Sequence, residues 1–410
     1  MVIRLGSIDN NVNDSALNAL LAEMSRIAGN TTPGLLSDKG RLSFRRIDKE
    51  TVLTVSGIQE LLRSCGFFPG GRVDGICGYR TRAAIRLFQE YVRSVENRPC
   101  TPDGIAGPKT MAELLRWKQA DLKADWLPLL RNWETKNSSQ SEFSAWLDYL
   151  NEVKAHHQRQ PSPMLAKVNE FAGQSDTYPV SQWHFSDRDI HLIGVRTGEE
   201  QTNRKFDDVL ILLLKGLVFK FQGSTDPGST KHPRGAPFLV QGQHDYRIGL
   251  HQGKYHALRP LHYDSHGVLV LRAKNGVQLG RDDLKSELEV NGTINIHWGG
   301  KGVGRRVNRW SEGCQVITGS GYQRHTGELV DCSDYVGINN TEVKSRGKSK
   351  TRGAYNVLAD LIVAMSSDMP SPGLVKYMLL SEDDLSIRSD ISTIVASSRQ
   401  TAADFIRTLA

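Results

Sequence analysis

A short motif occurs twice between residues 51 and 119, and it constrains the fold of this segment more than any other feature of the sequence. The copies begin at Asp74 and Asp103, and both follow the pattern Asp-Gly-Ile-x-Gly-x-x-Thr. Asp-Gly favours a tight turn, the second glycine allows close backbone approach, and the threonine hydroxyl can cap a following helix. Apolar spacing after each copy, and in the run that starts at Val55, predicts three short helices around one small core.

The order of these elements resembles a known family. A helix that contains Gln59, the first motif, a helix that ends Phe88-Gln89 and the second motif together resemble the peptidoglycan-binding domain found on many cell-wall enzymes. The resemblance covers residues 51–119 and implies that this segment binds peptidoglycan. On the residues alone, a helical packing module without a ligand is the alternative.

The rest of the chain predicts an α+β multidomain protein. Residues 1–50 are expected to form an N-terminal helix and a loop, and residues 120–164 carry apolar stripes that predict a helical linker. Over residues 165–385, short β-rich runs are separated by glycine and proline, which favours a mainly antiparallel sheet domain. Residues 386–410 are expected to form a C-terminal helix.

The cysteines direct attention to one position. The chain has five cysteines and no CxxC motif, so neither a disulfide framework nor a zinc–thiolate site is indicated and at least one thiol is free. Cys314 follows a small-residue turn, and a β-run delivers His297 into a glycine-rich loop. A thiol needs a nearby imidazole to become a thiolate at neutral pH, and two adjacent loops can supply such a pair. A buried structural cysteine is the alternative on these residues alone.

The surrounding pattern resembles a second family. Ile-His-x-Gly at His297, followed by Ser-x-Gly-Cys ending at Cys314, resembles the catalytic signature of the L,D-transpeptidase catalytic domain family. That resemblance implies a β-sandwich-like fold over about 165–385, with Cys314 as the nucleophile and His297 as its base. Ser311 and Gly313 match the serine and glycine of the signature, and they could position the pair or donate to an oxyanion.

The resemblance also implies a reaction. The Cys314 thiolate would attack an L-centre to D-centre amide of a stem peptide and form an acyl-enzyme, without a cofactor. Water as acceptor gives an L,D-carboxypeptidase or endopeptidase, and an amine gives an L,D-transpeptidase. Glu312 stands where the family commonly has histidine, and Val316 stands where it often has arginine or asparagine. These departures leave the contacts to the substrate carboxylate, and therefore the acceptor, open.

Residues on and near the signature are candidates for contacts with the stem peptide. Histidine and tyrosine side chains upstream of the signature could line a substrate groove, and the neighbours of the proposed nucleophile and base stand beside the reacting atoms. The predicted substrate-binding residues are His251, Tyr255, His256, Trp298 and Gln315.

Two other functions stay open. Most of the 12 histidines lie between His184 and His297, and none forms a tight ligand motif, so we predict no metal. The segment His262-Tyr-Asp264-Ser-His266 could nevertheless bring two imidazoles and a carboxylate together, which makes a zinc-dependent peptidoglycan peptidase the second mechanism. A non-catalytic wall-binding or virion structural protein is the third possibility.

Charge and hydropathy predict where the protein acts. The 52 basic and 45 acidic residues give a net charge of +7 and are mostly interleaved, which favours a soluble surface over nucleic-acid binding. No apolar run approaches the roughly 20 residues of a transmembrane helix, and the N-terminus shows no secretory signal. Because peptidoglycan lies in the periplasm or cell wall, we expect a phage lysis enzyme released by lysis or an antibacterial effector exported by a non-classical route.

Overall fold

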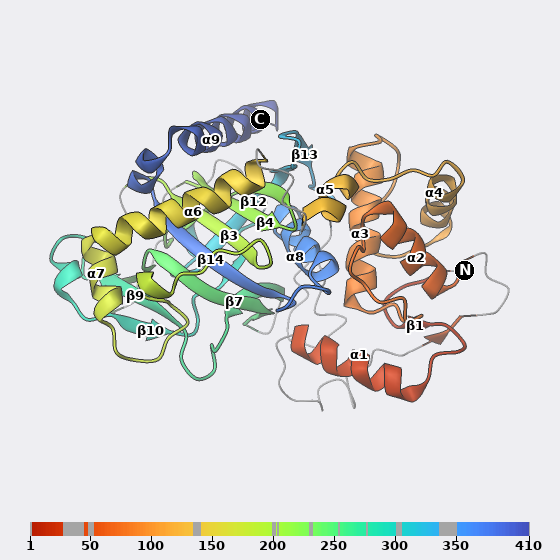
Figure 1. The fold of residues 1–410 in the computed structure, drawn as a ribbon, viewed down its shortest axis with the longest axis horizontal. Coiled ribbons are helices and arrows are strands. Elements are labelled where there is room, and N and C mark those ends of the chain that lie inside the picture. The colour runs from red at the N-terminus through yellow and green to blue at the C-terminus, as the bar shows by residue number, and fades with distance from the viewer. Residues whose placement is uncertain are drawn as a thin grey trace. The chain divides into compact units, whose positions relative to one another are not determined.

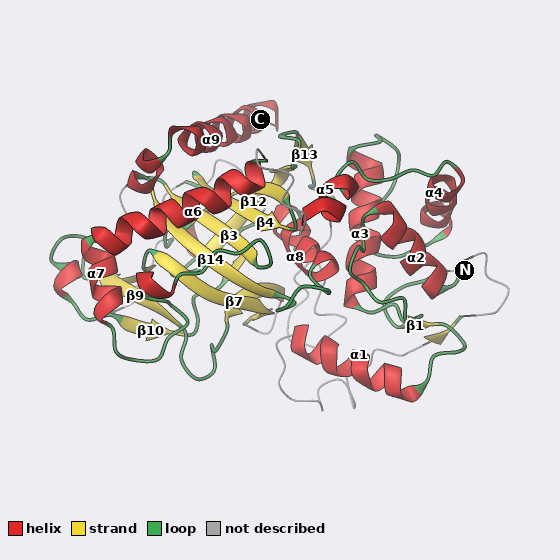
Figure 2. Cartoon of the chain, in the orientation of Figure 1, coloured by secondary structure: helices red, strands yellow, loops and turns green. Residues whose placement is uncertain are grey.

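A computed structural model gives the architecture of the chain (Figure 1). Helices and sheets are mixed, as Figure 2 shows, which agrees with the predicted α+β class. Within the residues that the structure describes, no helix is long and apolar enough to cross a membrane. The described residues are 2–27, 45–47, 53–133, 141–198, 202, 205–228, 233–252, 255–275, 278–300, 306–335 and 351–409.

The chain divides into two compact units, and neither is a continuous segment. The helical unit comprises Met1–Asn132, Ile248–His256 and Cys332–Gly373. The sheet unit comprises Trp133–Arg247, Ala257–Asp331 and Leu374–Ala410. The sequence predicted a series of continuous domains, whereas the polypeptide passes between these two units five times.

The helical unit contains the predicted module and further elements. Helix α2 begins after Thr54, whose hydroxyl accepts the N–H of Gly57, and it ends at Gly66 in a left-handed conformation with φ of 97°. Strands β1 and β2, which precede and follow α1 in the chain, form a short parallel pair. The elements of this unit are α1 (Asp14–Ile27), α2 (Val55–Cys65), α3 (Tyr79–Ser94), α4 (Pro108–Gln119), α5 (Leu127–Asn132), α8 (Ala354–Met365), β1 (Ser7–Ile8) and β2 (Arg45–Arg46).

Aromatic rings fill the core of the helical unit. Phe67 lies at the centre, with ring centroids of four neighbours between 5.4 and 5.6 Å away in edge-to-face geometry. The neighbours are Phe88, Tyr91, Trp117 and Trp126, and all of them are buried. Edge-to-face pairs add about 0.5–1.5 kcal/mol each beyond the burial of area, so this cluster fixes how α3 and α4 pack.

Helix α8 packs against α3 although the two are far apart in the chain. Every residue of α8 is buried. Arg86 of α3 forms an ion pair with Asp360 of α8 at 2.5 Å, and the Tyr335 hydroxyl donates to the other carboxylate oxygen. Burial raises the pKa of Asp360, and the guanidinium of Arg86 opposes that rise. The ion pair therefore joins two segments that both lie inside the helical unit.

The main sheet of the sheet unit closes on itself. Its strands follow the order β11-β8-β7-β14-β3-β4-β5-β12, and β12 also pairs with β11, so the hydrogen-bonded ring has no free edge between these strands. Strand β13 pairs with the C-terminal part of β12, residues 321–323. The resemblance implied a sandwich-like fold, which the closed ring does not reproduce. The bounds are β3 (Ile190–Arg196), β4 (Asp208–Leu214), β5 (Leu217–Ser224), β7 (Gly242–His251), β8 (Tyr255–Pro260), β11 (Ile296–Trp298), β12 (Gln315–Gln323), β13 (Leu329–Asp331) and β14 (Leu374–Ser381).

Helices cover the outer face of this sheet, as Figure 1 shows for α6 (Glu142–Arg159) and α9 (Ser389–Leu409). Trp146, Tyr149 and other buried residues of α6 share one hydrophobic core with residues of β3, β4 and β5. Residues 120–164 are therefore not a linker: α5 belongs to the helical unit, and α6 is part of the core of the sheet unit.

A smaller sheet completes the sheet unit. Its strand order is β10-β9-β6, with bounds Glu289–Asn291, Val268–Ala273 and Ala236–Leu239. Helix α7 (Pro163–Glu170) packs on it through Met164 and Val168, which share a core with residues of β6 and β9.

Candidate functional site

The two copies of the repeated motif are built around a buried glutamine each. The amide nitrogen of Gln59 lies within hydrogen-bonding distance of the Asp74 carboxylate, the Ile76 carbonyl and the Thr81 hydroxyl, at 2.8, 3.0 and 2.9 Å. Its amide oxygen accepts the N–H groups of Asp74 and Gly75. The glutamine therefore ties the turn to the helix that follows it.

The second copy repeats this arrangement. The amide nitrogen of Gln89 lies 3.0, 3.0 and 2.9 Å from the Asp103 carboxylate, the Ile105 carbonyl and the Thr110 hydroxyl. Its oxygen accepts the N–H of Gly104. The three contacts of the amide nitrogen and the N–H bond from the motif glycine recur at equivalent positions, so the repeat in the sequence is a repeat in the structure.

The two turns require the motif glycines, whereas the expected helix caps from the motif threonines are absent. Gly75 and Gly104 have φ of 72° and 75°, the left-handed region that glycine adopts readily. The threonines do not cap the helices: α3 and α4 begin after Gly78 and Gly107, neither of which offers a side-chain cap. Thr81 instead donates its hydroxyl to the Ile76 carbonyl, inside the turn.

Parallel pairing of β11 with β12 brings His297 and Cys314 together. His297 is aligned with Val316, two residues after Cys314, so alternation along the strand places both side chains on one face. A ring nitrogen of His297 and Sγ of Cys314 lie within 4.8 Å of each other. The sequence predicted that both residues sit on loops, whereas His297 is the central residue of β11 and Cys314 immediately precedes β12.

The thiol of Cys314 is enclosed by main-chain groups. The N–H of Asn295 donates to Sγ at 3.3 Å, and the S–H donates to the Thr293 carbonyl at 3.4 Å. Only 8% of the residue is exposed. The pKa of the Cys314 thiol is raised to about 11, chiefly by burial; the hydrogen bond from Asn295 opposes this shift and the charge of Glu312 adds to it. The resting side chain is therefore a neutral thiol at pH 7.

His297 is also neutral at pH 7. Burial lowers the pKa of its imidazole to about 4, and the hydrogen bond to the Trp298 carbonyl opposes that shift. Nδ1 of His297 lies 2.8 Å from that carbonyl oxygen. Because a carbonyl only accepts, the proton of the neutral ring sits on Nδ1, and Nε2 carries the lone pair.

Ser311 and Gly313 shape the loop before Cys314. The Ser311 hydroxyl donates to the Cys314 carbonyl at 2.6 Å and accepts the N–H of Gly313 at 3.0 Å. Gly313 has φ of 134°, and a Cβ there would lie 2.6 Å from Cγ of Pro237. Both residues therefore hold the loop in place, and the N–H of Gly313 is used inside the loop rather than directed at an acyl oxygen.

Gln315, predicted to bind substrate, is instead part of the core. It is fully buried, its amide nitrogen lies 3.4 Å from the Gly313 carbonyl, and its amide oxygen accepts the Tyr377 hydroxyl at 3.2 Å. Because side chains alternate along a strand, Gln315 points to the face opposite Cys314 and Val316. It supports the sheet and makes no surface for a peptide.

Three further predicted substrate contacts lie on the β7–β8 hairpin, in the part that belongs to the helical unit: His251, Tyr255 and His256. His256 is buried, and its ring packs edge-on against Tyr79 with centroids 5.9 Å apart. Burial, with Arg86 and Arg82 nearby, lowers the pKa of His256 to about 3. His256 is therefore a core residue of the helical unit. The rings of His251 and Tyr255 lie 5.2 Å apart.

A pair of tryptophans, one of which is exposed, stands beside the loop. Trp298, a predicted substrate contact, packs edge-on against Trp310 with centroids 5.2 Å apart, and Trp310 is 43% exposed. Gly300 allows this approach, because a Cβ there would meet the Trp310 ring at 2.8 Å. The sequence analysis did not single out Trp310, although it directly precedes Ser311.

One histidine cluster could hold a metal within the sheet unit. His262 and His266 meet a carboxylate, as the sequence suggested, but the carboxylate comes from Asp176 rather than Asp264. One donor atom from each of Asp176, His262 and His266 lies within 4.8 Å of the others.

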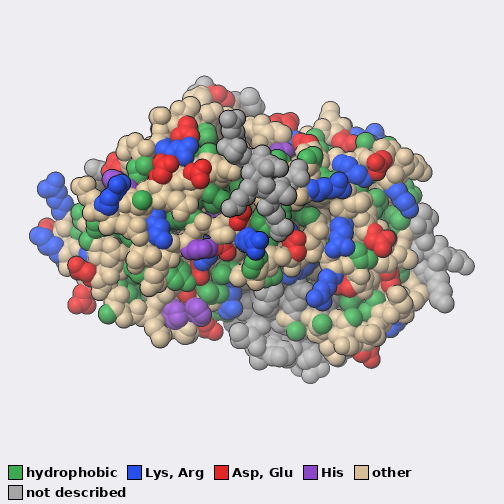
Figure 3. Space-filling model, in the orientation of Figure 1, with side chains coloured by type: hydrophobic (Ala, Val, Ile, Leu, Met, Phe, Trp, Pro, Cys, Tyr) green, Lys and Arg blue, Asp and Glu red, His purple; other side chains and the backbone are tan. Residues whose placement is uncertain are grey.

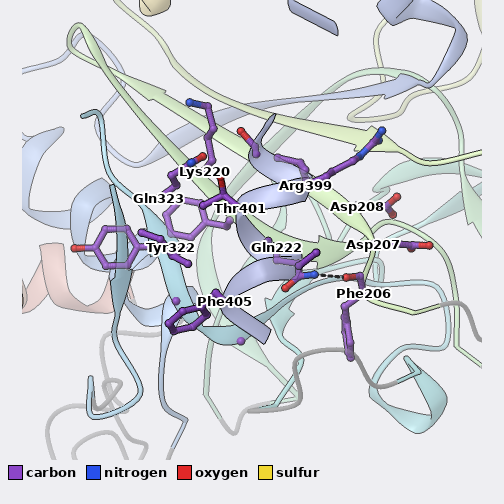
Figure 4. Close-up of a pocket in the computed structure, with 18 of the residues that line it drawn as sticks. Phe206, Asp207, Asp208, Lys220, Gln222, Tyr322, Gln323, Arg399, Thr401 and Phe405 are labelled. Atoms are coloured by element: carbon purple, nitrogen blue, oxygen red, sulfur yellow. Dashed lines mark hydrogen bonds between the residues drawn. The ribbon is translucent and has the colours of Figure 1, made fainter. Parts of the chain in front are cut away.

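A cavity of about 550 Å³ lies elsewhere in the sheet unit, between residues of β4, β5, β12 and α9 (Figure 4). Two of its cationic lining residues form ion pairs: Lys220 with Glu142 at 2.7 Å and Arg399 with Glu382 at 2.7 Å. None of the predicted site residues lines this cavity. Figure 3 shows basic and acidic side chains interspersed over the face that it presents.

Comparison with known proteins identifies one part of the chain. No curated protein and no solved structure matches the sequence. Residues 53–114 match the family model described as "Putative peptidoglycan binding domain". This match covers both copies of the Gln-Asp-Gly-Thr arrangement and confirms the first of the two resemblances. The chain therefore contains a peptidoglycan-binding domain within its helical unit.

Proposed function

We propose that the protein binds peptidoglycan through residues 53–114 and acts on its stem peptides through Cys314. Cell-wall association follows from the binding domain. The enzymatic part rests on one observation, the approach of His297 and Cys314 to within 4.8 Å on neighbouring parallel strands.

His297 has the tautomer that a general base needs. With the proton of the ring directed to the Trp298 carbonyl, the lone pair on Nε2 accepts the thiol proton of Cys314. The N–H of Asn295, 3.3 Å from Sγ, stabilises the thiolate as it forms.

The thiolate then attacks the carbonyl carbon of an L-centre to D-centre amide. Collapse of the tetrahedral intermediate breaks the C–N bond, and the imidazolium returns its proton to the leaving amine. The product is a thioester on Cys314. Water releases it as a carboxylate, which gives an L,D-carboxypeptidase or endopeptidase, and an amine releases it as a new amide, which gives an L,D-transpeptidase.

A second candidate function has an observation in its favour. Burial moves the pKa of Cys314 up to about 11 and that of His297 down to about 4, so burial opposes transfer of a proton from the thiol to the ring. A non-catalytic wall-binding protein with a buried thiol would have these same shifts. If the pair is catalytic, substrate binding must change the surroundings of the thiol.

The test compares the full-length chain with its Cys314→Ala variant on purified cell-wall sacculi, with mass spectrometry of the muropeptides. We expect the parent to alter stem peptides and the variant to bind sacculi equally without turnover. Cys65→Ala, which removes another buried thiol, is the matched control and should keep activity. A carbapenem should add its mass to the parent and not to Cys314→Ala.

Each contrary outcome would indicate a different function for this protein. No product and no carbapenem adduct with the parent would leave the non-catalytic function. Turnover by Cys314→Ala that a chelator abolishes would establish a zinc peptidase instead.

We also propose that the protein acts as a lysis enzyme or as an exported antibacterial effector. Production in the cytoplasm of a bacterial host should be tolerated, whereas production with an added periplasmic signal should arrest growth or lyse the cells. Equal growth in both cases, with both proteins detected, would contradict this role.

A further inference from the structure

We propose that the sheet unit binds one zinc ion through Asp176, His262 and His266. The proposal does not rest on the chemistry of Cys314. The sequence offered His262 and His266 only within an alternative zinc mechanism, and the carboxylate comes from a segment that the sequence did not connect with these histidines.

The two imidazoles converge on one oxygen of the Asp176 carboxylate. Oδ1 of Asp176 lies 2.6 Å from Nδ1 of His262 and 3.4 Å from Nε2 of His266. With bonds of about 2.0–2.1 Å, the ligands of tetrahedral zinc lie about 3.3 Å apart. The contact to His266 already has this spacing. The contact to His262 has the shorter spacing of a hydrogen bond and would open by less than about 1 Å when the metal enters.

Two of the three donors, Asp176 and His266, are oriented by a second contact. Oδ2 of Asp176 accepts the main-chain N–H of His262 at 2.8 Å, which turns Oδ1 toward both rings. Oγ of Ser265 lies 3.2 Å from Nδ1 of His266, so a proton on Nδ1 leaves Nε2 free to bind metal. Metal-binding histidines usually donate their other N–H in this way. The main-chain N–H of His266 donates to the His262 carbonyl, which closes the turn.

Burial and charge favour a cation. Asp176 is 2% exposed, and its ion-pair partners among the described residues are His262 and His266. A buried carboxylate needs compensating positive charge, which a bound cation supplies. The His262 side chain is 52% exposed and that of His266 19%, so the ion can reach the site from solvent and keep water as a fourth ligand.

The ligand types select zinc among common divalent ions. Two imidazoles and one carboxylate suit zinc, whereas magnesium and calcium prefer sets made only of oxygen. Other first-row metals with similar preferences bind the same donors, and cobalt can therefore report on them spectroscopically.

The ion would stabilise a turn that supports the Cys314 loop. Asp176 and His262 are 86 residues apart, so the metal cross-links distant segments of the sheet unit. A Cβ on Gly292 would lie 2.2 Å from the Tyr263 carbonyl oxygen, which means that the backbone at 292 rests directly on the turn. The next residue, Thr293, accepts the S–H of Cys314. The metal is therefore a positioning element that acts through the backbone of residues 292 and 293.

The experiment is a zinc titration of the chelator-treated full-length chain in competition with a chromophoric chelator. It is carried out in the Cys314→Ala background, so that a thiolate cannot contribute a ligand. We expect one zinc per chain. His262→Ala, a change at a half-exposed side chain that should fold, is expected to weaken binding by about 100-fold or more, and Ser265→Ala by about tenfold.

A matched control is available on the same unit. His184 is 65% exposed and lies 3.0 Å from Asp189, and this pair is outside the three-residue clusters found among the described residues. His184→Ala should leave affinity and stoichiometry unchanged. Cobalt should bind with the same stoichiometry and without a thiolate charge-transfer band.

The proposal is overturned if the parent binds no zinc at micromolar concentration, or if His262→Ala and His262→Gln bind as tightly as the parent. It is also overturned if His184→Ala loses the ion while His262→Ala keeps it. Circular dichroism of every variant separates loss of the site from loss of the fold.

Discussion

Replacing Gly313 with alanine tests how the loop before Cys314 is built. Gly313 has φ of 134°, and a Cβ there would lie 2.6 Å from Cγ of Pro237, 2.9 Å from its carbonyl oxygen and 3.0 Å from Cδ1 of Ile294. Alanine therefore meets both an unfavourable backbone conformation and an occupied space. Either Pro237 or the loop has to move.

The free-energy cost of the backbone conformation and that of the steric contact can each be estimated. A residue other than glycine in a sparsely populated φ region costs about 1–3 kcal/mol. Forcing an additional carbon into a well-packed site costs a further 1–3 kcal/mol or so. We expect Gly313→Ala to lower the free energy of unfolding of the sheet unit by about 2–6 kcal/mol. For a unit of roughly 150–250 residues, the middle of this range lowers Tm by about 8–16 °C.

Gly327→Ala is the control, because Gly327 has φ of 84° and nothing within 4 Å of its Cβ position. It should cost only the conformational term, about 1–2 kcal/mol. The measurement is urea unfolding, with hydrogen exchange of peptides from β3 to β5 to identify the transition of the sheet unit. Equal losses for the two variants, within about 0.5 kcal/mol, would refute the contact with Pro237 and the loop geometry built on it.

Two further predictions concern the repeated motif and the buried titratable groups. Gln89→Ala removes the hydrogen bonds of the second turn. It should destabilise the helical unit by about 2–4 kcal/mol in urea unfolding, because each buried bond contributes about 1 kcal/mol. A loss below about 1 kcal/mol would show that Gln89 does not hold the turn together. The sheet unit should lose stability as pH falls from about 6.5 toward 4. Burial lowers the pKa of His191 and His297 to about 4 and that of His244 to about 3. The unfolded chain therefore binds protons at a higher pH than the folded chain does, and acid favours unfolding. His297→Gln should lose less stability over that range, and an unchanged slope would show that His297 is not buried as a neutral ring.

The sequence predicted the parts of the candidate site that depend on local pattern. The β-run before His297 and the small-residue turn before Cys314 were enough to expect the two side chains to meet, and the parallel register of β11 and β12 is the physical reason that they do. The burial of Gln315 could also have been predicted, since it alternates with Cys314 and Val316 along one strand.

Contacts between distant segments could not be predicted in this way. Nothing near His256 in the sequence indicates that its ring packs on Tyr79, and nothing near His262 indicates Asp176. Helix α8 is apolar except for Asn356 and Asp360, which predicts burial but not that its partner is α3. Such pairings depend on the closed fold of the whole chain, which local periodicity does not encode.

The ion pair between Arg86 and Asp360 has a consequence for synthesis of the protein. The two residues are 274 positions apart, so translation at about 5–20 residues per second delivers Asp360 roughly 14–55 s after Arg86. During this time the peptidoglycan-binding helices are complete except for the face that α8 covers. A nascent chain with that face exposed is a substrate for chaperones and is prone to aggregate. A polypeptide that ends before Ala354 keeps the face exposed permanently, so excised wall-binding fragments should be far less soluble than the full chain.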